Sequence, residues 1–175
     1  MTALRDWVHT VADLGERPIS RKRQATEEER IELARELDIV SCESLDVAYE
    51  IKPLGKERYA FAGTLDAAVT QACVVTLEPI PARLKESFSI ELRPPEVMED
   101  EEPVAGDREV SSIADVEPIE DGRIEVGALI FAVMSAALVP YPRKPDAAFD
   151  WVDPKADDPK TASPFAALAK LKPRP

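Results

Sequence analysis

The sequence predicts an α+β fold. In it, an antiparallel β-meander, or a partly open barrel of at least four strands, packs with an N-terminal helix and a late apolar helix. Three observations support this prediction: a helix-start signal near residue 26, alternating apolar and polar residues in the middle of the chain, and a long uncharged stretch near residue 130. Because 175 residues suffice for one hydrophobic core, we predict a single α+β domain over residues 1–149.

The first helix is predicted from Glu27 to Leu37. Thr26-Glu27-Glu28-Glu29 forms a capping box, since the Thr26 hydroxyl can accept from the Glu29 amide while the Glu29 carboxylate reaches back. An apolar stripe follows, made of Ile31, Ala34 and Leu37 with Leu33 beside them. By contrast, the first fifteen residues fit either a short amphipathic helix or the start of a strand, and both alternatives stay open.

Four segments with a two-residue period follow. Leu45, Val47, Tyr49 and Ile51 alternate with polar or small residues, which is typical of a half-buried strand. Further strands are predicted at residues 59–65, 69–77 and 84–92, with a bulge or bend at Gly63. Their short connections predict an antiparallel meander.

A late helix is predicted over residues 124–139, ending at Pro140 because a proline ring clashes with the preceding turn. Fourteen uncharged residues follow Glu125, fewer than the roughly twenty that a bilayer span needs. We therefore expect a buried or interface helix and no membrane partner. Its surplus apolar surface would favour a homo-oligomer.

Charge is distributed unevenly. Of the net −12, residues 96–121 carry −10, with eleven acidic residues against Arg108. We predict an acidic, solvated insert over 96–121 and a proline-rich linker with a short helical patch over 150–175. Four consecutive acids are a candidate surface for a basic partner, with cation binding as the alternative: Glu99, Asp100, Glu101 and Glu102.

Catalytic and cofactor motifs are absent from the sequence. The six glycines are too widely spaced for a dinucleotide-binding or phosphate-binding loop, and His9 is the only histidine. Cys42 and Cys73 have no metal-ligand spacing, and Cys73 is expected to pack on a strand face beside Val69. We therefore expect no enzymatic activity, no cofactor and no metal. Since no signal-peptide pattern opens the chain, a cytoplasmic location is expected.

Basic residues form candidate contacts for RNA or an acidic protein, if folding gathers them on one side. The alternative is that they are merely solvated ends. The candidates are Arg17, Arg21, Lys22, Arg23, Arg143 and Lys144.

Two stretches are similar to the YceD-like family, the large ribosomal RNA subunit accumulation proteins. The first contains Cys73, Leu77 and Pro79, and the second is the proline-rich turn after the late helix, Pro140, Tyr141, Pro142 and Arg143. Many relatives carry a second cysteine three residues after the first. Thr76 occupies that position here, so a zinc-type site is not carried over.

This resemblance implies a cytoplasmic, non-enzymatic factor. It would support accumulation or assembly of large-subunit ribosomal RNA by binding a ribosomal protein, a pre-large-subunit particle or ribosomal RNA. Two alternatives from other classes stay open. One is a metal-dependent hydrolase that uses carboxylates of the acidic insert, and the other is an acidic homo-oligomeric scaffold.

Overall fold

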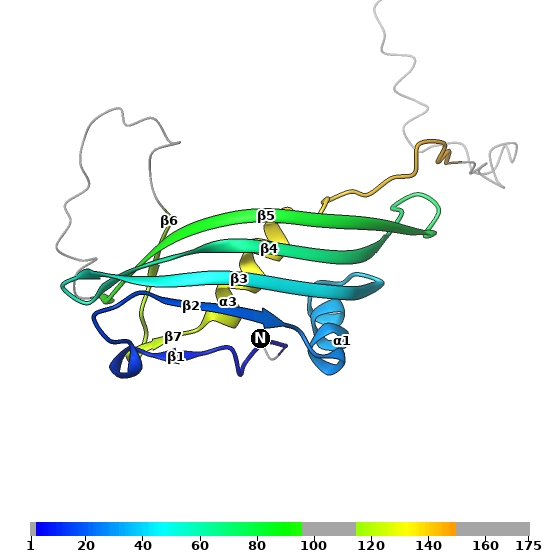
Figure 1. Ribbon diagram of the computed structural model, residues 1–175. Coiled ribbons are helices and arrows are strands. Elements are labelled where there is room, and N and C mark those ends of the chain that lie inside the picture. The colour runs from blue at the N-terminus through cyan, green and yellow to red at the C-terminus, as the bar shows by residue number, and fades with distance from the viewer. Residues whose placement is uncertain (1–2, 96–114, 150–175) are drawn as a thin grey trace, which may run out of the picture.

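The computed structural model describes residues 3–95 and 115–149 (Figure 1). The elements in chain order are β1 (His9–Thr10), the 3-10 turn η1 (Val11–Asp13), β2 (Ile19–Gln24), α1 (Glu27–Glu36), β3 (Ser41–Gly55), β4 (Arg58–Ala72), β5 (Pro79–Arg93), β6 (Asp115–Pro118), β7 (Arg123–Ile124) and α3 (Val126–Ala137). Within these ranges, one sheet has the order β2-β3-β4-β5-β6, and β1 pairs with β7. The predicted α+β class is confirmed, and the sheet is an open meander.

Strands β2 to β5 are antiparallel neighbours, whereas β6 runs parallel to the last four residues of β5. Strands β3, β4 and β5 each span 15 residues. The prediction of separate strands at 59–65 and 69–77 was wrong, because β4 is continuous from Arg58 to Ala72.

Gly63 lies in regular register opposite Tyr49 and Phe88, so the predicted bulge was also wrong. A Cβ at this position would lie 2.3 Å from the Ala48 carbonyl oxygen and 2.8 Å from the Phe88 ring. The residue is therefore glycine because the neighbouring strand and the Phe88 ring come too close for a side chain.

Helix α1 begins as predicted. The Thr26 amide donates to Glu29 Oε2 at 2.7 Å, and the Glu29 amide donates to Thr26 Oγ1 at 3.2 Å, which completes the capping box. Leu33 and Ala34 face the core, but Ile31 is largely exposed and does not belong to the buried stripe.

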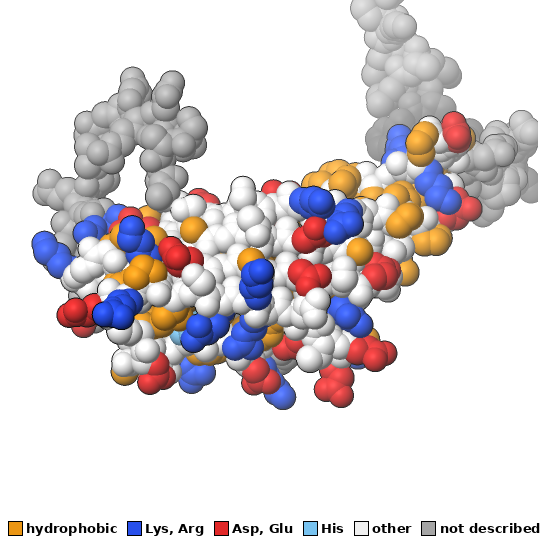
Figure 2. Space-filling model, in the orientation of Figure 1, with side chains coloured by type: hydrophobic (Ala, Val, Ile, Leu, Met, Phe, Trp, Pro, Cys, Tyr) orange, Lys and Arg blue, Asp and Glu red, His pale blue; other side chains and the backbone are white. Residues whose placement is uncertain are grey.

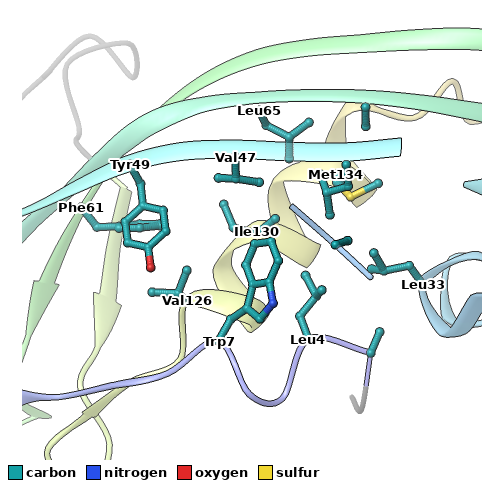
Figure 3. Packing of buried hydrophobic residues seen from close by; sticks show 14 of the residues in the cluster. Leu4, Trp7, Leu33, Val47, Tyr49, Phe61, Leu65, Val126, Ile130 and Met134 are labelled. Atoms are coloured by element: carbon teal, nitrogen blue, oxygen red, sulfur yellow. The ribbon is translucent and has the colours of Figure 1, made fainter. Parts of the chain in front are cut away.

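The core lies between the inner face of the sheet and α3, and the N-terminal segment 3–7 covers the other side of this helix (Figure 3). Side chains from β3 and β4 point toward α3, which contributes Val126, Ile130 and Met134. The alternation predicted for β3 is confirmed, since Leu45, Val47, Tyr49 and Ile51 are all buried.

Of the two structures left open for the N-terminal segment, the structure has the strand, but only over the two residues of β1. Trp7 is 2% exposed, and its Nε1 donates to Glu29 Oε1 at 2.8 Å. The guanidinium of Arg23 lies 5.5 Å from the centre of the Trp7 ring, a cation–π geometry. The Trp7 carbonyl accepts from the Gly127 amide at 3.0 Å and so ties this segment to the start of α3.

Helix α3 occupies the predicted position but is shorter than the predicted range of 124–139. Its buried side chains face the sheet and the N-terminal segment, while Ala132, Ser135 and Ala136 are exposed. In the described part of the chain, neither helix has the length and apolarity needed to cross a membrane.

A candidate interaction platform at one end of the sheet

The two stretches that carry the family resemblance meet at one end of the sheet. Residues 73–78 connect β4 to β5, and residues 139–144 follow α3. The Val74 amide donates to the Pro142 carbonyl at 2.9 Å, and Lys144 Nζ donates to Glu78 Oε2 at 2.9 Å. The side-chain amide of Gln71 donates to the Val139 carbonyl at 2.9 Å. We refer to residues 73–78 and 139–144 together as the motif platform.

The loop of the platform has a defined internal geometry. The Cys73 amide donates to the Glu78 carbonyl, and the Leu77 amide donates to the Cys73 carbonyl, both at 2.8 Å. Leu77 has a φ of 60°, a left-handed conformation that costs a non-glycine residue roughly 1–2 kcal/mol. In this conformation the Leu77 side chain is 78% exposed. The hydrogen bonds of the loop therefore hold an apolar side chain outward.

The Cys73 sulfur lies at the centre of the platform and is 0% exposed. Its pKa is lowered to about 6, chiefly by a hydrogen bond from the Thr76 side chain and then by the backbone amides of Lys144, Thr76 and Val75. The single hydroxyl proton of Thr76 is shared between this sulfur and Glu78 Oε2, which lies 3.1 Å from Thr76 Oγ1. Although Cys73 has no exposed surface, burial opposes the anion less than these hydrogen bonds favour it. The lowered pKa favours the thiolate form at neutral pH, and the hydrogen bonds to the sulfur link residues 73–78 to Lys144.

The prediction that Cys73 packs on a strand face was wrong, since β4 ends at Ala72. The other cysteine behaves as a conventional buried thiol. Burial raises the pKa of Cys42 to about 11, and its sulfur donates to the Ser44 carbonyl at 3.6 Å. The two thiols therefore differ because only Cys73 is surrounded by hydrogen-bond donors.

Replacing Thr76 with valine is expected to raise the Cys73 pKa toward its ordinary value of about 9, because the largest stabilising contact with the thiolate is removed. The ultraviolet absorbance of the thiolate, followed against pH, measures this change. Cys42 does not interfere, since it stays protonated until pH values near 11. Thr76→Ser is the matched control and should keep the low pKa. An unchanged midpoint in Thr76→Val would contradict this account of the sulfur.

The lowered pKa of Cys73 also makes the stability of the fold depend on pH. Because the pKa of Cys73 is lower in the folded state, the thiolate stabilises the fold fully above the unfolded pKa. This contribution is lost as the pH falls through about 6. The destabilisation caused by Thr76→Val should consequently be larger at about pH 8 than at about pH 5.

Exposed apolar side chains gather around the platform. Figure 2 shows hydrophobic atoms concentrated at the end of the molecule where the β4–β5 loop and the segment after α3 lie. Tyr141 is 80% exposed, and Val74, Leu77 and Val139 are also among the most exposed large apolar residues. Large apolar residues clustered in this way, with charges beside them, are typical of an interaction site.

The six candidate basic residues are not brought together. Arg21, Lys22 and Arg23 lie on β2, at the opposite edge of the meander from β5, and Arg17 lies in the turn before β2. Because side chains alternate along a strand, Arg23 faces Trp7 on the inner side while Lys22 faces outward. Arg143 and Lys144 belong to the motif platform, where Lys144 is paired with Glu78.

A shallow depression of about 770 Å³ on the outer face of the sheet was not predicted from the sequence. Its centre contains Asp46 and Asp66, which are opposite each other on β3 and β4. Arg83 holds Asp66 in a bidentate pair at 2.8 Å, which lowers the pKa of this carboxyl, and Gln24 donates to Asp46 at 2.6 Å. Each of these two carboxylates is therefore held by a neighbouring donor.

The candidate acidic surface at Glu99, Asp100, Glu101 and Glu102 lies outside the described residues, as does most of the acidic insert. The hydrolase alternative depends on those carboxylates. Among the residues that are described, no group of three or more histidine, cysteine or acidic residues is arranged to hold a metal ion.

His9 is hydrogen-bonded to the Tyr49 hydroxyl at 2.9 Å, and burial followed by the charges of Arg23 and Arg21 lowers its pKa. The imidazole therefore connects the N-terminal segment to β3.

Comparisons of the chain with protein-family models, with curated proteins and with solved structures find no match.

Proposed function

We propose that this protein is a non-enzymatic, cytoplasmic binding factor that supports the accumulation or assembly of large-subunit ribosomal RNA. The motif platform is its contact surface for a ribosomal protein or a pre-large-subunit particle. One observation supports the proposal above all. The two stretches similar to the YceD-like family are far apart in the sequence, yet they form one hydrogen-bonded unit that exposes apolar side chains.

The composition of the platform suits macromolecular binding. Interface cores are enriched in aromatic and large apolar residues, and Tyr141 and Leu77 are such residues in exposed positions. Charged residues surround them at Glu78, Arg143 and Lys144, which resembles the polar rim of an interface.

The platform is also preorganised for binding. The Cys73 thiolate, the Val74–Pro142 bond and the Lys144–Glu78 pair fix the relative positions of its two segments before any partner arrives. Ordering a loop on binding costs free energy, which weakens the affinity for the partner. A loop that is already ordered in the free protein avoids most of this cost. Such preorganisation would offset the conformational cost of the left-handed leucine at position 77.

The proposal predicts that the double variant Leu77→Ser and Tyr141→Ser separates from pre-large-subunit particles when lysate of its own cells is sedimented, whereas the wild-type chain co-migrates with them. We expect at least about a tenfold loss of affinity, since each interface anchor contributes about 1–2 kcal/mol or more. Both side chains are mostly exposed, so the fold should be preserved.

The matched control is Leu54→Ser, which removes an exposed apolar side chain beside the β3–β4 turn, at the opposite end of β4 from the platform. This control should still co-migrate. Wild-type protein found only in the free fraction, at low and moderate salt alike, would refute the ribosomal assignment. Co-migration of the platform variant would show that another surface makes the contact.

A further inference from the structure

Within the described residues, most of one edge of strand β5 has no strand beside it. On one side β4 pairs with it almost along its whole length, from Pro79 to Leu92. On the other side β6 pairs only with residues 90–93, and no other strand of the described residues continues the sheet beyond residues 79–89 (Figure 1). An unpaired edge presents backbone donors and acceptors that another strand can bind.

The hydrogen bonds at the two ends of β5 establish which backbone groups point to this edge. The Arg93 carbonyl accepts from the Ile119 amide on the β6 side at 2.7 Å, whereas the Glu78 carbonyl accepts from Cys73 on the β4 side at 2.8 Å. Backbone groups alternate along a strand, and the β4–β5 register has no irregularity. The odd-numbered residues therefore point to the open edge, including Arg83, Lys85, Ser87 and Ser89.

The prolines of β5 follow the same parity. Pro79 and Pro81 lack an amide proton at positions that would face outward, where no bond to β4 is lost. Both lie before Arg83, so the donors from Arg83 to Ser89 are intact.

The open edge lies beside an apolar floor. Helix α3 contacts β5 on the inner face of the sheet, and Ala128 and Leu129 lie with Ile119 in a depression at the β6 end. One and two turns further along the same side of α3, Ala132 and Ala136 are exposed. A strand continuing the line of β6 would cover these small residues, as Ile119 covers the beginning of the helix.

We infer that the edge of β5 from Arg83 to Ser89 is a docking site for an extended segment of a partner protein, which adds a strand to the sheet in line with β6. On the outer face this segment presents acidic or polar side chains, because the outer-face side chains of β5 along this edge include two cations and no acid. They are Arg83, Lys85, Ser87 and Ser89. On the inner face it presents apolar side chains over α3. This inference goes beyond the proposed function, since it holds whether or not the partner belongs to the ribosome.

A second copy of this chain fits the edge poorly. Antiparallel self-pairing centred at any residue from Arg83 to Glu86 places like charges opposite each other: Arg83 against itself or Lys85, Lys85 against itself, or Glu86 against itself. A register centred at Ser87 runs the second strand into β6, which begins opposite Ile90.

The test uses the full chain and a synthetic ten-residue peptide of alternating Glu and Val as the strand donor. In the free protein, the amides of Lys85, Ser87 and Ser89 should exchange with solvent about 100-fold faster than those of Leu84, Glu86 and Phe88, which pair with β4. The peptide should slow exchange of the outward amides at least about tenfold. A Lys-Val peptide of the same length should have little effect.

Ser87→Pro removes the amide proton that points to the open edge, and no hydrogen bond to β4 is lost with it. This variant should abolish the effect of the peptide. Ser87→Ala keeps the amide proton and should respond like the wild type. Two results would overturn the inference. One is no slowing with the Glu-Val peptide at millimolar concentration. The other is protection of the outward amides in the free protein. If the outward amides are protected in the free protein, a doubled native mass would mean that a second copy of the chain covers the edge. A monomeric mass would mean that residues of the same chain cover it.

Discussion

Replacing Trp7 with alanine is expected to lower the free energy of unfolding by about 3–5 kcal/mol, the usual range for a buried tryptophan. The side chain is 2% exposed and lies against α3 (Figure 3). Its loss also leaves the Glu29 carboxylate without the indole donor and removes the ring beneath Arg23. Urea denaturation followed by circular dichroism measures the effect, with an unchanged slope expected for a two-state transition.

Two control variants separate the contributions to this effect. Trp7→Phe keeps most of the apolar volume and should lose less than the alanine variant, whereas Glu29→Ala with Trp7 retained removes the acceptor and the capping box together. A loss below about 1 kcal/mol for Trp7→Ala would mean that the N-terminal segment does not cover α3 in solution.

Replacing Gly127 with alanine is expected to lower the free energy of unfolding by about 3 kcal/mol, at the upper end of the cost of overpacking. An alanine Cβ would lie 2.1 Å from the Leu4 carbonyl oxygen and 2.7 Å from its Cβ. Backbone cannot give way as the end of a flexible side chain can, so the N-terminal segment must move off α3. The helix propensity of alanine, favourable by about 1 kcal/mol over glycine, offsets only part of this loss.

Gly15→Ala is the matched control, because a Cβ there has no heavy atom within 4 Å. We expect this variant to be neutral or slightly stabilised, since alanine restricts the unfolded chain more than glycine does. Equal stability of the two alanine variants in thermal denaturation would argue against close contact between segment 3–7 and α3.

Local signals in the sequence predicted the elements that depend on local physics. The capping box at Thr26 and the alternation from Leu45 to Ile51 specify α1 and the core face of β3, and both are found. The late helix was recognised from its uncharged composition.

Strand β2 was missed because Ile19-Ser-Arg-Lys-Arg-Gln24 has no apolar alternation. It forms because β3 provides an edge to pair with, and because Arg23 can pack its side chain on Trp7. Strand β4 was divided in two between residues 65 and 69, and Gly63 was interpreted as a bulge or bend because glycine weakens a strand in isolation. Only the close approach of Ala48 and Phe88 explains a glycine in an unbroken strand.

The platform could be anticipated only as two separate motifs. Nothing local indicates that the Val74 amide meets the Pro142 carbonyl, because 68 positions separate these residues and α3 must first cross the sheet. The low pKa of Cys73 was equally hidden. The largest cause of the low pKa is the side chain of Thr76. In the sequence this residue was noted only because it is not a cysteine, which excluded a zinc-type site.

The position of α3 between the sheet and segment 3–7 has a consequence for synthesis. Leu4 and Trp7 are translated before the sheet, but their binding surface on α3 exists only after Val126 to Ala137 have been translated. Until then the nascent hairpins of β3, β4 and β5 expose a hydrophobic surface. Exposed hydrophobic surface makes the nascent chain prone to aggregation and dependent on chaperones. We expect a stop codon before residue 126 to yield insoluble material rather than a smaller working protein.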